Sequence, residues 1–173
     1  MDALIVIDMQ EDLLRGDEKY ELAAVVDRIN RLAERVRQRG GTVIFVQHDG
    51  TPDDGFVPFT PGWEILSSIQ RKPPDRTVHK TLNDAFFGTS LESDLKQLGT
   101  ERVLITCWAT DFCVDAAVRS ATALGFKVVV VADGKTVSAR PHLSPERVIE
   151  YHHWIWTNIL SPHPVKIVRE AEL

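Results

Sequence analysis

The stretch "RVLITCWATDFCVDAAVRSATALG" (102–125) joins a short apolar run to a segment of helical spacing, and it contains both cysteines of the chain. The run 102–106 has the continuous apolar character of a strand that is covered on both faces. The segment 111–125 is typical of a helix, with Asp111 as a plausible N-cap and a glycine after its last turn. We therefore predict a strand, a tight turn and a helix, with Cys113 in the first turn of that helix.

Further apolar runs and further segments of helical spacing alternate along the rest of the chain. The runs lack the two-residue alternation of half-exposed strands, which favours a parallel sheet with helices on both faces. We therefore predict an α/β fold with three layers, α/β/α, and expect ligand sites beyond the carboxyl ends of the strands. The further strands are expected at 3–7, 42–47, 76–80, 127–133 and 165–168, and the further helices at 21–41, 90–99 and 144–160.

The size and composition of the chain are those of one soluble globular domain spanning residues 1–173. A chain of this length buries about 70% of its unfolded surface. Its 43% hydrophobic and 26% charged residues are an ordinary balance for such a domain. The net charge of −5 comes without a basic block, so nucleic acid is not an expected partner. The apolar runs are too short to cross a bilayer, so no membrane partner is expected either.

The N-terminus and the cysteine content point to a cellular compartment. The segment "MDALIVIDMQ" (1–10) has an acidic residue where a signal peptide carries lysine or arginine, and its apolar run is brief. Two cysteines in a chain of this length do not make a disulfide framework. We therefore expect a reducing, cytoplasmic location.

Three chemically versatile side chains follow three of the predicted strands: Asp8, Lys80 and Cys113. Each has an ordinary explanation, since Asp8 can cap a turn, Lys80 can be a solvated loop lysine and Cys113 can be a small buried hydrophobe. Inert burial suits Cys107, which follows the predicted strand. Cys113 differs, because the first turn of a helix favours a thiolate and lowers the pKa of the thiol. A nearby lysine would act in the same direction and a nearby carboxylate could take the proton, so the three form a consistent nucleophilic set.

The motifs around these residues resemble those of the isochorismatase-like cysteine hydrolases. In that family an early strand ends in Asp-x-Gln, here Asp8-Met9-Gln10. A later strand ends in lysine and leads into a Phe-x-Gly-Thr-x-Leu loop, here "HKTLNDAFFGTSL" (79–91). The third motif is an Ala-Thr-Asp-x-Cys-Val turn, here "ATDFCV" (109–114), followed by small residues. Each motif alone is weak, but the three occur in the family's order and are specific together.

The resemblance implies a Rossmann-like, six-stranded parallel sheet in the order 3-2-1-4-5-6. It implies that Asp8 is the acid/base, that Lys80 is its orienting charge partner and that Cys113 is the nucleophile. It also implies an oxyanion hole made by the backbone N–H groups of Ala109 and Cys113, preceded by a cis peptide bond between Trp108 and Ala109. In that strand order Lys80 has to reach inward across the second strand to meet the other two side chains.

Several residues near these motifs are candidates for a substrate pocket. The aromatic ones can equally be loop anchors, and the histidine can equally be a capped loop residue. The segment 48–75 is a long loop with five prolines, and loops of that length in compact domains are usually functional. The substrate-binding candidates are Gln10, His48, Asn83, Phe86 and Trp108, with Trp63 and Phe87 as further aromatic candidates.

No metal or other cofactor is expected. Nicotinamidases of this family bind a metal through an Asp-x-His pair after the second strand, whereas here Asp49 has no histidine two residues on, and none follows before His79. The pair His152-His153 lies in a predicted helix, where adjacent residues point in different directions, so a packing role is preferred.

These features predict a metal-independent cysteine hydrolase. It would cleave the C–N bond of a small amide, ureido or carbamoyl compound through a thioester intermediate. Two alternatives stay open: an isochorismatase-type ether hydrolase that needs Asp8 but not Cys113, and a non-catalytic member of the fold that binds a small ligand.

The predicted helix at 144–160 carries apolar residues on more than one face, although one stripe suffices to pack a helix on a sheet. We therefore expect a homo-oligomer, at least a dimer, because exposed aromatic patches commonly mark interfaces. Phe56, Phe59 and Trp63 offer a second apolar surface in the long loop. The alternative is that residues 161–173 fold back over the helix within one chain.

Overall fold

The computed structural model describes residues 1–173, and its centre is a six-stranded sheet in which all neighbouring strands are parallel. The strand order is β3-β2-β1-β4-β5-β6, which confirms the order that the resemblance implies. The chain moves outward in one direction from β1 and in the other from β4, so the topological switch point lies between these strands. The strands are β1 (Asp2–Ile7), β2 (Thr42–His48), β3 (Arg76–Lys80), β4 (Arg102–Cys107), β5 (Lys127–Lys135) and β6 (Lys166–Val168).

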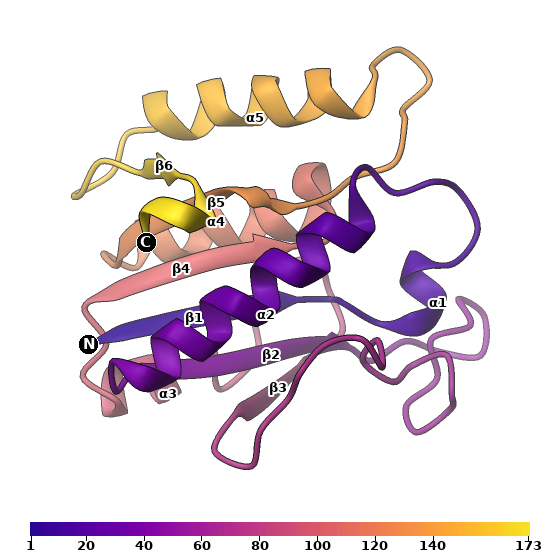
Figure 1. The fold of residues 1–173 in the computed structure, drawn as a ribbon, viewed down its shortest axis with the longest axis horizontal. Coiled ribbons are helices and arrows are strands. Elements are labelled where there is room, and N and C mark those ends of the chain that lie inside the picture. The colour runs from indigo at the N-terminus through magenta and orange to yellow at the C-terminus, as the bar shows by residue number, and fades with distance from the viewer.

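Helices cover both faces of this sheet, which confirms the three-layer α/β/α arrangement. Figure 1 shows α2 in front of the sheet and α4 behind it, while α5 runs beside the edge that carries β6. None of the helices is both long enough and apolar enough to cross a membrane. The helices are α1 (Glu11–Leu14), α2 (Leu22–Gln38), α3 (Leu91–Gln97), α4 (Asp115–Ala123) and α5 (Pro145–Asn158), with a π-helical turn η1 (Thr110–Val114) and a 3₁₀ turn η2 (Glu170–Glu172).

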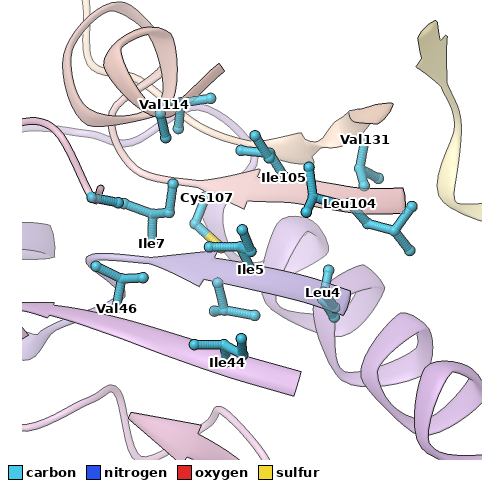
Figure 2. Close-up of a cluster of buried hydrophobic side chains, with 14 of the residues drawn as sticks. Leu4, Ile5, Ile7, Ile44, Val46, Leu104, Ile105, Cys107, Val114 and Val131 are labelled. Atoms are coloured by element: carbon cyan, nitrogen blue, oxygen red, sulfur yellow. The ribbon is translucent and has the colours of Figure 1, made fainter. Parts of the chain in front are cut away.

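The central strands are buried on both faces, which explains their unbroken apolar runs. Figure 2 shows side chains from adjacent strands packed together, among them Ile5, Ile44 and Ile105. Each such aliphatic side chain stabilises the fold by about 1.5–3 kcal/mol through burial. The sulfur of Cys107 points into the same cluster, as the prediction of an inert, buried cysteine requires.

The segment after β4 differs from the predicted continuous helix. Residues Thr110–Val114 form the π-helical turn η1, and α4 begins only at Asp115. Asp111 does not cap the helix, because its carboxylate accepts two hydrogen bonds from Arg140, at 2.6 and 2.8 Å. Apolar spacing identifies the helix but does not reveal this wider turn, a feature that often occurs at functional sites.

The end of β5 fixes the position of η1. The register between β4 and β5 shifts between Ile105 and Cys107, and β5 continues to Lys135, beyond its predicted end. Thr136 follows directly, and its carbonyl oxygen accepts hydrogen bonds from both the backbone N–H and the hydroxyl of Thr110. The turn η1 is therefore held by the residue that follows β5 as well as by its connection to β4.

The C-terminal segment does not cover the outer face of α5. β6 pairs with β5, and Glu170 pairs with Arg35 of α2 at 2.5 Å, which directs the last residues toward α2. Tyr151 and Trp154 on α5 remain 55% and 64% exposed. The alternative in which residues 161–173 fold back over these side chains is therefore wrong.

Candidate active site

Asp8, Lys80 and Cys113 meet at the carboxyl edge of the sheet. The Nζ atom of Lys80 lies 2.8 Å from Oδ2 of Asp8 and 3.4 Å from Sγ of Cys113. Lys80 is paired with His48 in the register of β3 and β2, so its side chain extends past the end of β2 to meet Asp8 after β1. A buried lysine side chain thus bridges two strands that are not neighbours.

Asp8 lies directly after β1 with a left-handed backbone (φ 53°), which aspartate tolerates better than most residues. Burial raises the pKa of its carboxyl group, and the ammonium of Lys80 opposes that rise. Oδ2 is paired with Lys80, whereas Oδ1 is buried and has no hydrogen-bond partner. A carboxylate with a raised pKa and one free oxygen beside a thiol is suited to proton transfer.

The pKa of Cys113 is higher than its place near a helix N-terminus predicts. Burial and the Asp8 carboxylate raise the pKa of the thiol to about 12, and together they outweigh Lys80, which lowers it. Cys113 is the fourth residue of η1, so it does not occupy the first turn of α4. The prediction of a low pKa was therefore wrong, and the proton stays on the sulfur at neutral pH.

The turn before Cys113 presents a free backbone N–H group. The Trp108–Ala109 peptide bond is cis. Ala109 precedes η1 in an extended conformation, and its N–H donates to no backbone carbonyl. Because Ala109 and Cys113 line the same cavity, this N–H group is available to an oxygen atom bound there.

A cavity of about 290 Å³ opens over Cys113. Of the predicted binding residues, His48, Asn83 and Trp108 line it, and the thiol also contacts Oδ1 of Asn83 at 3.7 Å. Burial and the charge of Lys80 lower the pKa of His48, so its imidazole is neutral at pH 7. The cavity has further lining residues that were not predicted for it: Leu13, Phe56, Phe112 and Arg140.

Gln10 and Phe86 are corrections to the predicted binding set, because neither lines the cavity. The Gln10 amide joins two loop segments: Nε2 donates to the carbonyls of His48 and Trp63, and Oε1 accepts from the His48 N–H at 2.7 Å. Phe86 is buried in the hydrophobic core beside Phe126, with ring centroids 6.2 Å apart. A motif therefore identifies these residues but does not tell which way their side chains point.

Trp63 and Phe87 also lie outside the cavity. The Trp63 ring stacks on His79, with centroids 5.6 Å apart, and its N–H donates to Oδ1 of Asp49 at 2.8 Å. His79 Nδ1 lies 3.1 Å from that same oxygen, while Phe87 is exposed. Asp49 and His79 thus pair with each other, and no group of three or more His, Cys, Asp or Glu side chains gathers where a metal ion could bind.

The sequence matches a known family over most of its length. Residues 2–151 match the family model described as "Isochorismatase domain". The chain is 34% identical over 146 residues to streptothricin hydrolase of Streptomyces noursei. The aligned residues are 82% of this chain but 53% of that protein. It is also 28% identical over 170 residues to ureidoacrylate amidohydrolase of Caulobacter vibrioides, and this alignment covers 76% of this chain and 75% of that protein. The chain therefore spans little more than half the length of the first of these relatives.

Solved structures share the fold over nearly the whole chain. One described as an isochorismatase family protein has a TM-score of 0.87 and 26% identity, and the match covers 96% of this chain and 97% of that one. N-carbamoylsarcosine amidase from Thermoplasma acidophilum has a TM-score of 0.79 and 22% identity, with 99% and 98% covered. At that identity the second match shows the fold alone.

Proposed function

This chain belongs to the isochorismatase family, and from that premise we propose that it is a hydrolase, namely a metal-independent cysteine amidohydrolase. Its substrate would be a small amide, ureido or carbamoyl compound. The observation that carries the proposal is the contact of Lys80 with both Asp8 and Cys113 at the edge of one cavity. The curated relatives support it, since one is a streptothricin hydrolase and another a ureidoacrylate amidohydrolase.

The first half of the proposed reaction forms a thioester. Asp8 takes the thiol proton through its free oxygen while the sulfur of Cys113 attacks the substrate carbonyl carbon. The N–H groups of Ala109 and Cys113 bind the oxyanion, and removal of one such donor typically costs about 10²–10³ in rate. The tetrahedral intermediate then breaks its C–N bond, and Asp8 passes the proton to the departing amine.

The second half releases the acyl group. Water attacks the thioester carbonyl, Asp8 accepts a proton from that water, and the C–S bond breaks. The proton on Asp8 then returns to the sulfur of Cys113, which restores the starting state and yields a carboxylic or carbamic acid. Lys80 keeps Asp8 in place and stabilises each thiolate as it forms, because its ammonium contacts both groups.

A screen of small amides, ureides and carbamates, with release of ammonia or amine as the readout, tests this proposal. The expected result is hydrolysis that is lost in Cys113→Ala and reduced by about 10²–10⁴-fold in Asp8→Asn. The panel also includes a vinyl ether of the isochorismate type. Cleavage of that ether by Cys113→Ala, without hydrolysis of any C–N compound by the wild type, would replace the proposal with the ether-hydrolase alternative.

The cellular location is part of the same proposal. Both cysteines are free thiols, and neither has a disulfide partner within the chain. A cysteine nucleophile is preserved in a reducing compartment, so we place the enzyme in the cytoplasm. Cell fractionation with an antibody against the chain tests the location, and recovery in a secreted or periplasmic fraction would contradict it.

We further propose that the chain forms a homo-oligomer through the outer face of α5. Tyr151 and Trp154 are exposed there, and they line a shallow hollow together with Leu143 and the ion pair of Arg147 and Glu150. This surface carries both signs of charge around an apolar centre, so it can pair with a second copy of itself about a two-fold axis. Light scattering at micromolar concentration tests the proposal, and a mass near 19.5 kDa would contradict it.

A further inference from the structure

The cavity over Cys113 contains one charged side chain that the proposed chemistry does not use. Among the lining residues only Asp8 and Arg140 are charged at neutral pH, because His48 is neutral. The charge of Asp8 is balanced by Lys80 at 2.8 Å. Arg140 is paired as well, with Asp111, but that partner lies outside the cavity, so the guanidinium is the cation that a ligand in this cavity meets.

The Arg140 guanidinium is held in place but not saturated with hydrogen bonds. Its Nε and one Nη2 hydrogen donate to the two oxygens of Asp111, at 2.6 and 2.8 Å, and Asp111 itself does not line the cavity. Its flat face lies over the Phe112 ring, 5.3 Å from the centroid. The two Nη1 hydrogens and the second Nη2 hydrogen have no acceptor, so three donors remain, two of them parallel on the Nη1/Nη2 edge.

A second cation lies near the same wall. The ammonium of Lys19 lies 5.1 Å from the centroid of the Trp108 ring, and that ring lines the cavity. Burial lowers the pKa of Lys19 most, Asp17 opposes this, and the charge of Arg140 lowers the pKa further, which means that the two cations are close enough to interact. Both cations favour an anion at this side of the cavity.

We propose that Arg140 binds a carboxylate of the substrate, so that the enzyme acts on ureido or carbamoyl acids in preference to neutral amides. The inference rests on the proposed function and narrows its substrate class. A guanidinium edge with free N–H groups matches the two oxygens of a carboxylate, and its ion pair with Asp111 fixes the orientation in advance. Leu13, Phe56 and Phe112 supply apolar walls, which suit the short carbon segment between the carboxylate and the scissile carbonyl.

Matched substrates measure the contribution of the carboxylate. N-carbamoylglycine and N-isobutylurea have similar sizes and shapes, but the first carries a carboxylate where the second carries an isopropyl group. The wild type should prefer N-carbamoylglycine by about 10- to 100-fold in kcat/KM, as expected for hydrogen bonds to a charged group. N-carbamoyl-β-alanine, paired with its own branched alkylurea, extends the test by one methylene group.

Variants of the arginine and its partner identify the group responsible. Arg140→Gln should abolish the preference, because kcat/KM should fall much further for N-carbamoylglycine than for N-isobutylurea, which lacks the anion. Arg140→Lys should keep part of the preference. Asp111→Asn, the matched control, keeps the guanidinium and one oxygen that can accept a hydrogen bond from it, so this variant should keep most of the preference. The double variant Arg140→Gln/Asp111→Asn should lose the preference for N-carbamoylglycine as well. That result would show that repulsion by an unpaired Asp111 carboxylate does not cause the loss.

A binding measurement separates this inference from the proposed function. Calorimetry with Cys113→Ala should give about 10- to 100-fold tighter binding of N-carbamoylglycine than of N-isobutylurea, whether or not the wild type hydrolyses either. That binding result without any turnover would leave the carboxylate site standing and count against the amidohydrolase. Equal binding of the two compounds, or an equal loss of both activities in Arg140→Gln, would overturn the carboxylate site and leave a structural role for Arg140.

Discussion

Cys107 and Cys113 lie six residues apart and share a pKa of about 12, yet the structure gives them opposite surroundings. The sulfur of Cys107 is fully buried in the hydrophobic core (Figure 2). It contacts the Thr106 hydroxyl at 3.0 Å. Cys113 is 9% exposed, lines the cavity and lies 3.4 Å from the Lys80 ammonium. The difference teaches that reactivity here depends on what a sulfur faces and what can take its proton, and not on the resting pKa of the thiol.

The largest effect should come from removing each sulfur in turn. Cys113→Ala should reduce kcat/KM on the preferred amide by at least about 10⁴-fold, as loss of a nucleophile does in other covalent hydrolases. Cys107→Ala, the matched control, should change kcat/KM by less than about threefold and lower stability through the small cavity it leaves. Steady-state kinetics of both purified variants decide this. Comparable losses in the two variants would remove the distinction between the cysteines.

The next-largest effect should come from breaking the ion pair of Asp8 and Lys80, which lies beside Cys113. Asp8→Asn should lower kcat/KM by about 10²–10⁴-fold, because it removes the proton acceptor. It should also destabilise the protein by about 3–5 kcal/mol, because Lys80 is then buried without its counter-ion.

The double variant Asp8→Asn/Lys80→Met separates these two consequences. It should recover much of the lost stability but none of the activity, since the uncompensated charge is gone and the proton acceptor is still missing. Denaturant unfolding measures the stability of the wild type, both single variants and the double variant. If Asp8→Asn were as stable as the wild type, the pairing of Asp8 with Lys80 would not be what holds the site together.

A smaller effect of Asp8→Asn should appear in alkylation, where the reaction rate of Cys113 should rise and not fall. The Asp8 charge raises the pKa of Cys113 and Lys80 lowers it, so Asp8→Asn should lower that pKa. At pH 8 the variant should therefore react about tenfold faster with iodoacetamide at Cys113, although it hydrolyses substrate more slowly. In the wild type the Cys113 rate should rise about tenfold per pH unit between pH 7 and 10, below the thiol pKa of about 12.

Cys107 provides the internal control for alkylation. It should react at least about 100-fold more slowly than Cys113 in every variant, because the fully buried sulfur is reached only when the structure opens. Trypsin releases both cysteines in one peptide, 103–119, so the modified residue has to be assigned from fragment ions. A slower reaction of Cys113 in Asp8→Asn would mean that Asp8 favours the thiolate in the resting protein.

The sequence was sufficient to predict the fold and the position of the three central side chains. Continuous apolar runs identified the buried strands, and residues that follow parallel strands necessarily share one edge of the sheet. Asp8, Lys80 and Cys113 were found in that way. The reach of Lys80 across β2 was expected only from the strand order that the resemblance implies, because apolar runs alone do not show which strands are neighbours.

Other features of the site depend on tertiary contacts that leave no local signal. The pKa of Cys113 follows from burial beside Asp8, which outweighs the helix terminus that the sequence does show. Gln10 belongs to a recognisable motif but points toward backbone groups of the loop. Arg140 belongs to no motif, and its place beside the cavity, where it pairs with Asp111 of η1, is a tertiary contact.

The central claim is that Cys113 forms a covalent bond with the substrate, and rapid acid quenching followed by mass spectrometry tests it most directly. Wild-type enzyme mixed with excess of the preferred amide should carry an acyl group on Cys113 within peptide 103–119, located by fragment ions. Cys107 should stay unmodified, and Cys113→Ala should carry no adduct and show no turnover. Turnover that persists in Cys113→Ala without any adduct would contradict the account, because hydrolysis would then proceed without the sulfur.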